Sequence, residues 1–206
     1  MKYQKIFWLE DTPDILGDVL RICAEHGVDK DSLFSRITFA PDYESGAEIV
    51  KAQEFDLYLL DADFPETTDE GWKKRYWEFM QNISLKTEHG DFLQYFEDKN
   101  ESRYGPGYIG PSNNNFSRFF DQFLRDQNKT AVYSISSIAP TVAFHYGLPF
   151  YSKALDKEDI EKVVARNIGD ERFLSRFIPA HIVPKIQDLE QWEYGSRFEF
   201  VERYLL

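Results

Sequence analysis

Four carboxylates in the first third of the chain are candidates for metal binding or for nucleophilic chemistry. Glu10 and Asp11 form one pair, and Asp61 and Asp63 form the other. Each pair closes a short apolar run of the length expected for a buried strand. In an open α/β sheet, ligands bind beyond the carboxyl ends of the strands, so these carboxylates could ligate a metal or act as a nucleophile. The structural alternative is an acidic turn, or an acidic pair that complements the dipole of a following helix.

Apolar runs of strand length alternate with helical stripes along the first third of the chain. Strands are predicted at 6–9, 37–40 and 55–61, with helices from Thr12 to Gly27 and from Asp42 to Gln53 between them. This alternation predicts right-handed crossovers and therefore an α/β fold with a doubly wound parallel sheet. The carboxylate pairs would then lie together at one edge of that sheet.

Composition limits the class of the protein and the kinds of partner. The chain has 206 residues, which suits one domain or one domain with a large elaboration. Its formal net charge of −12 disfavours nonspecific binding to nucleic acid or to anionic membranes. The single cysteine, Cys23, excludes an internal disulfide and a cysteine-rich metal site. Neither a membrane-span run nor a signal-peptide pattern is found, so we expect a cytoplasmic protein.

Three segments around the carboxylates resemble the receiver domain of two-component response regulators. They occur in the same order and at nearly the same spacing as in that family, and they are residues 7–16, 40–47 and 56–65. The resemblance implies a flavodoxin/CheY-like fold, in which the doubly wound parallel sheet has five strands in the order 2-1-3-4-5. It also implies that Asp61 is the phosphoacceptor and that residues 1–169 form the receiver-like domain.

The same resemblance assigns roles to residues in the later part of the chain. Lys153 corresponds to the lysine that contacts the phosphoryl group, and Phe150 to the aromatic residue that rotates on phosphorylation. The hydroxyl of the fourth strand aligns first with Ser136 and second with Ser134, and Ser136 and Phe150 would form the switch. Mg²⁺ prefers oxygen ligands and would relieve the repulsion among the carboxylates. The expected ligands are Glu10, Asp11, Asp61 and the main-chain carbonyl of Asp63.

Two segments depart from the receiver pattern. Residues 66–115 form an expected helical insertion, which ends in a loop rich in glycine, proline and asparagine that is either a connector or a lid. Residues 170–206 form an aromatic, acidic extension, which we expect to pack on the core or at a dimer interface. An aromatic extension without an output domain is consistent with a homodimer.

These features predict a protein of phosphorelay signal transduction, in which Mg²⁺-dependent phosphorylation of Asp61 switches an interaction surface. Its partners would be a histidine kinase or phosphotransfer protein and a downstream protein. One alternative is an aspartate-nucleophile phosphohydrolase, because Asp61-Ala62-Asp63 also resembles the motif of haloacid-dehalogenase-type phosphatases and of receiver-like proteins thought to process cyclic phosphates. Another is a receiver-like interaction module that is not phosphorylated.

Overall fold

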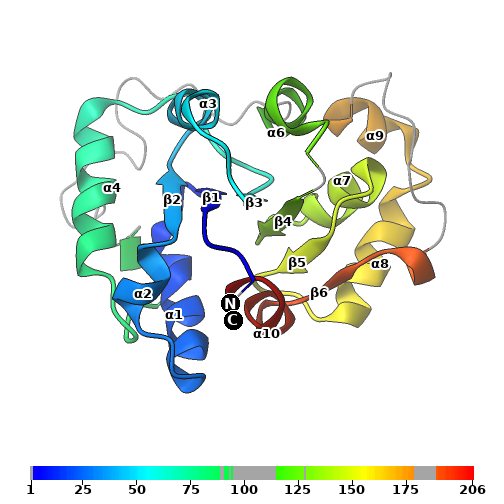
Figure 1. Cartoon of the computed structure of the whole chain (residues 1–206). Coiled ribbons are helices and arrows are strands. Elements are labelled where there is room, and N and C mark those ends of the chain that lie inside the picture. Colours follow the sequence, from blue (N-terminus) through cyan, green and yellow to red (C-terminus); the bar gives the residue numbers. More distant parts are fainter. Residues whose placement is uncertain (1, 89–90, 93, 95–114, 128, 179–188) are drawn as a thin grey trace.

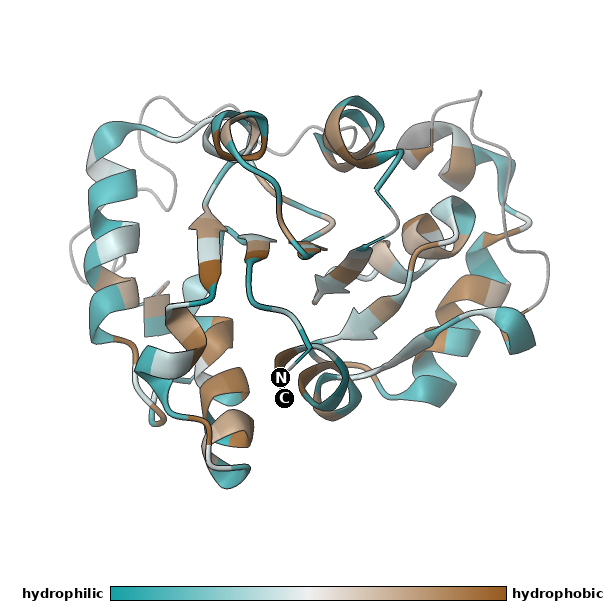
Figure 2. Cartoon of the chain, in the orientation of Figure 1, coloured by the Kyte–Doolittle hydropathy of each residue, from teal (hydrophilic) through white to brown (hydrophobic). Residues whose placement is uncertain are grey.

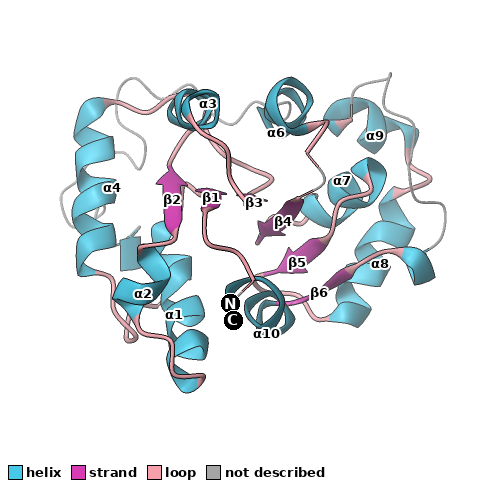
Figure 3. Cartoon of the chain, viewed as in Figure 1, coloured by secondary structure: helices cyan, strands magenta, loops and turns pink. Residues whose placement is uncertain are grey.

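The chain folds into an α/β structure around one parallel sheet. The computed structural model describes residues 2–88, 91, 92, 94, 115–127, 129–178 and 189–206. Within this part of the chain the sheet has six strands in the order β2-β1-β3-β4-β5-β6, with helices on both faces (Figure 3). The strands are β1 (Ile6–Leu9), β2 (Ile37–Ala40), β3 (Leu57–Leu60), β4 (Thr130–Ser134), β5 (Phe150–Ser152) and β6 (Tyr194–Ser196).

The predicted strand count of five is wrong, and the order 2-1-3-4-5 is therefore incomplete. The first five strands follow that order, but β6 is added beside β5 at the edge of the sheet, in parallel. The strand has three residues, with Gly195 at its centre, so it lacks the apolar run by which a buried strand is predicted. Backbone pairing of Tyr151 with Gly195 defines it instead, and that pairing exists only in the folded chain.

Helices of moderate length connect the strands. None of those in the described part of the chain combines the length and the apolar character that crossing a membrane requires. Several begin at an aspartate whose side chain accepts a backbone N–H of the first turn, as Asp42 and Asp156 do. The α-helices are α1 (Leu16–Glu25), α2 (Lys30–Phe34), α3 (Tyr43–Ala52), α4 (Glu70–Asn82), α6 (Asn115–Phe119), α7 (Ala139–Tyr146), α8 (Lys157–Asn167), α9 (Glu171–Phe177) and α10 (Arg197–Phe200). Short turns of other helix types are η1 (Pro13–Ile15), η2 (Phe120–Leu124), η3 (Leu189–Gln191) and η4 (Val201–Leu205).

Side chains of the strands alternate between two hydrophobic layers. In β1, Ile6 and Trp8 belong to one layer, and Phe7 and Leu9 belong to the other. The first layer is covered by α1, α4 and α10, and the second by α3, α6, α7 and α8 (Figure 1). The strands are mostly hydrophobic, whereas α4 is mostly hydrophilic, as expected for a helix with one face toward solvent (Figure 2).

The described end of the C-terminal extension completes the first layer. Helix α8 lies on the same face of the sheet as α7, whereas the residues that follow β6 lie on the opposite face. There the ring of Phe200 in α10 stacks on Tyr133 of β4, with 4.0 Å between centroids. The guanidinium of Arg36 donates to the carbonyls of Tyr3 and Leu205, which ties both ends of the chain together.

The insertion after β3 is described only in part. Its first expected helix is α4, which packs Trp72 and Tyr76 against the first layer. Most of the second expected helix, and the loop predicted as a connector or lid at 105–115, lie outside the described residues apart from Asn115. Asn115 opens α6, and its side-chain amide donates to the carbonyl of Phe64, close to the end of β3.

Candidate functional site

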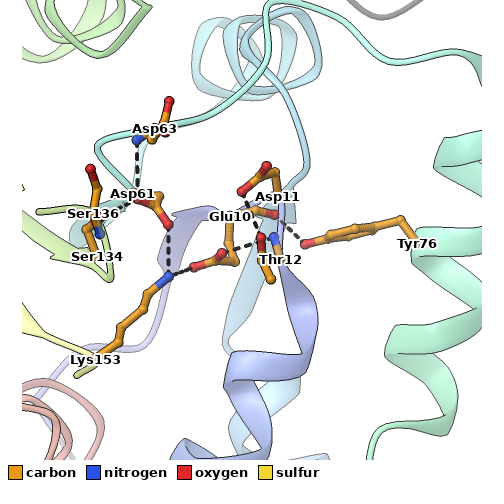
Figure 4. Close-up of polar contacts among 9 residues, drawn as sticks. All are labelled: Glu10, Asp11, Thr12, Asp61, Asp63, Tyr76, Ser134, Ser136 and Lys153. Carbon is orange, nitrogen blue, oxygen red and sulfur yellow. Dashed lines mark hydrogen bonds and ion pairs between the residues drawn. The ribbon is translucent and has the colours of Figure 1, made fainter. Parts of the chain in front are cut away.

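Three carboxylates meet at the carboxyl edge of the sheet. β1 and β3 are parallel neighbours in which Leu9 pairs with Leu60, so the residues that follow them are brought side by side. One carboxylate oxygen from each of Glu10, Asp11 and Asp61 lies within 4.8 Å of the other two. All three residues are buried, and Figure 4 shows them in close-up. The predicted grouping of these carboxylates at one edge is therefore present.

Lys153, in the turn after β5, extends between two of these carboxylates (Figure 4). Its ammonium donates to Asp61 Oδ2 at 2.9 Å and also to Glu10 Oε2. Only 1% of its side chain is exposed. Burial alone would lower the pKa of Lys153, but the negative charges of Asp61 and Glu10 outweigh that effect and raise the pKa above its ordinary value. The ammonium is therefore kept charged.

The hydroxyl that contacts Asp61 is that of Ser134, at the end of β4. Ser134 Oγ donates to Asp61 Oδ1 at 2.5 Å, and it accepts the backbone N–H of Ser136 at 3.0 Å. The resemblance to receiver domains ranks Ser136 before Ser134. In the structure, however, β4 ends at Ser134, and Ser136 lies beyond it in the loop that leads to α7. The Ser136 hydroxyl faces the N–H of Ile138, with 3.5 Å between the two atoms.

Neighbouring groups hold the acidic pair after β1 in position. The backbone N–H of Thr12 donates to Glu10 Oε1 at 3.0 Å, and its hydroxyl donates to Asp11 Oδ1 at 3.2 Å. The hydroxyl of Tyr76, which comes from α4 in the insertion, donates to the main-chain carbonyl of Glu10 at 2.8 Å. The insertion thus supports the site directly through a fully buried tyrosine.

Two tyrosines of the site were missed by sequence reasoning. Tyr76 falls in a helical stripe of aromatic residues, which predicts packing on the sheet and gives no signal for a hydrogen bond to Glu10. The ring of Tyr133 lies under the ammonium of Lys153, with 5.3 Å from Nζ to the ring centroid. Its place in β4, one residue before Ser134, could have indicated that it faces the other layer, but not that it reaches Lys153.

The cluster has the composition of a site for a hard cation. Three buried carboxylates face a single ammonium, so negative charge is in excess wherever the carboxylates are ionised. Burial raises the pKa of the Glu10 carboxyl well above its ordinary value; Lys153 opposes this rise, and Asp61 and Asp11 add to it. A divalent cation with oxygen ligands would remove this penalty. The cluster can therefore bind a metal through Glu10, Asp11 and Asp61.

The side chains of Asp63 and Phe150 lie outside this cluster, and the main-chain carbonyl of Asp63 as a metal ligand stays a prediction. Asp63 is exposed, its carboxylate points away, and its backbone N–H donates to Asp61 Oδ1 at 3.2 Å (Figure 4). Phe150 is fully buried in the second hydrophobic layer and stacks on Trp192 of the extension, with 6.1 Å between centroids. The candidate site therefore consists of Asp61, its partners Ser134 and Lys153, and the acidic pair Glu10 and Asp11.

A pocket of about 410 Å³ adjoins the cluster on the side of β5. Lys153 and Ser152 contribute to its wall, together with Ile135 and Phe198, whose side chains are 42% and 51% exposed. Asp18, Asp156 and Arg197 also line the pocket, so it has charges of both signs beside its apolar side chains. Large apolar side chains that remain exposed around a pocket are typical of a surface that receives another molecule.

Comparison with protein-family models, with curated proteins and with solved structures finds no match to this chain.

Proposed function

We propose that this chain is a receiver-like signalling protein in which Asp61 accepts a phosphoryl group. The observation that carries the proposal is the environment of the Asp61 carboxylate. Ser134 contacts one of its oxygens at 2.5 Å, Lys153 contacts the other at 2.9 Å, and Glu10 and Asp11 provide the carboxylates of a cation site beside it. A carboxylate nucleophile, a hydroxyl donor, a cationic donor and a metal site are the parts that phosphoryl transfer to aspartate requires.

The reaction follows from these groups. A carboxylate oxygen of Asp61 attacks the phosphorus of a phosphohistidine donor, and the phosphorus–nitrogen bond breaks. The electron pair of that bond leaves with the imidazole, and an aspartyl phosphate is formed. The Lys153 ammonium, which now donates to Asp61 Oδ2, would donate to a phosphoryl oxygen, and the Ser134 hydroxyl would donate to another. Both donors already contact Asp61, the residue that would carry the phosphoryl group.

Magnesium is the cofactor in this proposal. Glu10, Asp11 and Asp61 would hold it, since their oxygens already lie within 4.8 Å of one another. When bound, it would neutralise charge on the transferred phosphoryl group. The protein supplies the preorganised carboxylates, with Thr12 fixing the acidic pair and Tyr76 fixing the backbone of Glu10.

The proposed partners are a histidine kinase or phosphotransfer protein as donor and a downstream protein as receiver of the signal. The switch would involve the extension as well as Phe150. Trp192 stacks on Phe150, and its indole N–H donates to the carbonyl of Leu148 at 2.8 Å. A movement of Phe150 would therefore have to displace Trp192 and the edge strand β6 that follows it. This would carry the change at Asp61 to the surface around β6.

The phosphohydrolase alternative requires a general acid near the leaving group. In an Asp-x-Asp phosphatase the second aspartate has that role, and here it would be Asp63. Its carboxylate is exposed and points away from Asp61, so it lies outside the cluster of Glu10, Asp11 and Asp61 (Figure 4). This arrangement favours formation of a phosphoaspartate over its rapid turnover.

The test is incubation with Mg²⁺ and acetyl phosphate or phosphoramidate, followed by intact-mass measurement. We expect wild type and Asp63→Asn to gain one phosphoryl group, and Asp61→Asn to gain none. Asp63→Asn is the matched control, because it makes the same chemical change two residues away at an exposed position. Equal phosphorylation of Asp61→Asn and wild type would place the adduct elsewhere and exclude the proposal.

Two other outcomes would select the alternatives. Turnover of a phosphoester that requires both Asp61 and Asp63 would identify a phosphohydrolase. A folded wild-type protein that gains no phosphoryl group and turns over no phosphoester, although Mg²⁺ raises its melting temperature, would identify an interaction module with an idle site.

A further inference from the structure

A second pocket lies at the opposite, amino edge of the sheet. It has a volume of about 320 Å³ and is bounded by the first residues of two central strands, Leu57 of β3 and Thr130 of β4. Tyr3, just before β1, and Pro149, just before β5, complete this edge. The pocket shares no residue with the acidic cluster, and the length of the strands separates the two.

The lining of this pocket is cationic, although the protein carries a net charge of −12. Four cations and one carboxylate, Glu193, contribute to it. Two of the cations are arginines that already have carboxylate partners, since Arg125 pairs with Asp121 and Arg203 with Glu193. The other two are Lys2 and Lys129.

The two lysines have no carboxylate within ion-pair distance among the described residues. Lys2 Nζ lies over the ring of Tyr3, 4.9 Å from its centroid. Lys129 is anchored by its backbone, because its carbonyl accepts the N–H of Tyr58 at 2.8 Å. Both side chains are exposed, so their ammonium groups can turn toward a bound anion without breaking an ion pair.

An unpartnered buried hydroxyl is a second, independent feature of the pocket. Thr130 is 5% exposed, and its Oγ1 has no hydrogen-bond partner in the described part of the chain. A buried polar atom without a partner costs free energy, and such atoms are rare unless water or a ligand satisfies them. Thr130 lines the pocket, and rotation of its buried side chain would bring the hydroxyl toward a ligand there.

We propose that this amino-edge pocket binds a small phosphate ester or inorganic phosphate. Two lysines without ion pairs supply two positive charges, which match the dianion of a phosphate group better than the single charge of a carboxylate. The Thr130 hydroxyl would supply a neutral donor once its side chain turns toward the ligand. The volume of about 320 Å³ suits one small ligand. This site goes beyond phosphorylation of Asp61 and does not depend on it.

The experiment is an NMR titration of the ¹⁵N-labelled full chain with inorganic phosphate, at ionic strength held constant with sodium chloride. We expect saturable shifts of amides near Tyr3, Leu57 and Thr130. Lys129→Gln should weaken binding by about fivefold, the effect of one exposed charge pair, and Thr130→Val by about threefold. Lys162→Gln is the matched control, because Lys162 is exposed on α8 and does not line the pocket.

Three results would overturn this proposal. Shifts that do not saturate would show that no site exists. Equal weakening in Lys162→Gln and Lys129→Gln would show nonspecific screening. Shifts at Asp61 and Lys153 that vanish in Asp61→Asn, without shifts at Thr130, would assign the anion to the acidic cluster instead. Because amino-edge binding should persist in Asp61→Asn, its failure is distinguishable from failure of the phosphorylation proposal.

Discussion

The two edges of the same sheet carry opposite charge and differ in how their polar groups are satisfied. At the carboxyl edge, Glu10 and Asp61 share one buried lysine, and Asp61 also accepts a serine hydroxyl. At the amino edge, lysines are exposed and without ion pairs, and the buried hydroxyl of Thr130 has no partner among the described residues. The polar groups of the carboxyl edge therefore contact one another before any ligand binds. At the amino edge, the lysine ammonium groups and the Thr130 hydroxyl remain available as hydrogen-bond donors.

Strand β4 joins the two edges, with Thr130 at one end and Ser134 at the other. The two residues have similar hydroxyls and are both buried, yet only Ser134 has a carboxylate to contact. Differences between Thr130 and Ser134 in their contribution to stability should therefore reflect their surroundings and not the residue type. The comparison predicts that substitutions at the carboxyl edge cost stability, while equivalent substitutions at the amino edge cost little.

The largest effect is expected for Lys153→Met. Removing the ammonium leaves Glu10 and Asp61 buried and without their shared partner, which should destabilise the fold by about 3–5 kcal/mol. Urea unfolding monitored by circular dichroism gives the change in the free energy of unfolding. Lys162→Met is the control, and at its exposed position it should change that free energy by less than about 0.5 kcal/mol. A loss below about 1 kcal/mol for Lys153→Met would refute this view of the carboxyl edge.

The next largest effect is expected from magnesium. At a concentration 100-fold above its dissociation constant, Mg²⁺ should stabilise the folded wild type by about 2.7 kcal/mol, since it binds only the folded carboxylate cluster. The measurement is the rise in melting temperature on adding MgCl₂. Asp11→Asn should abolish most of the rise and Asp63→Asn should retain it, because the carboxylate of Asp63 lies outside the cluster. An equal rise in both variants would remove the argument for a metal here.

A smaller loss is expected for Ser134→Ala. The substitution removes a hydrogen bond to the Asp61 carboxylate and should destabilise the protein by about 2 kcal/mol in urea unfolding. Ser136→Ala is the matched control two residues later, where the hydroxyl faces only a backbone N–H at 3.5 Å. If Ser136→Ala costs as much as Ser134→Ala, the assignment of the Asp61 contact to Ser134 is wrong.

The smallest effect, and one of opposite sign, is expected for Thr130→Val at the other end of β4. Valine has nearly the shape of threonine and lacks the unpartnered hydroxyl, so the substitution should leave stability unchanged or increase it by up to about 1 kcal/mol. The same urea experiment, carried out without phosphate, provides the comparison. A clear destabilisation would mean that Thr130 Oγ1 is satisfied in the folded protein, for example by water, and that its part in the amino-edge pocket must be abandoned.

Much of the candidate site could be predicted from the sequence. Glu10, Asp11 and Asp61 each follow an apolar run, and in a parallel sheet such positions converge at one edge whatever the details of packing. Lys153 was predicted to join them, and it does so between Glu10 and Asp61. The resemblance ranked Ser136 before Ser134, whereas Ser134 contacts Asp61. The choice depends on the residue at which β4 leaves the sheet, and two serines at this spacing give the same local signal.

The sequence by itself determined the alternation of strands and helices in the first third of the chain and the identity of the acidic edge, whereas the order of the first five strands came from the family resemblance. The alternation and the acidic edge are local properties of apolar periodicity and of where each run ends. Only the tertiary structure decided that Tyr76 of the insertion supports Glu10, that Tyr133 lies under Lys153 and that three residues of the extension form β6. It also decided which cations meet at the amino edge. Each of these depends on contacts between residues far apart in the chain, and nothing in the local pattern specifies such contacts.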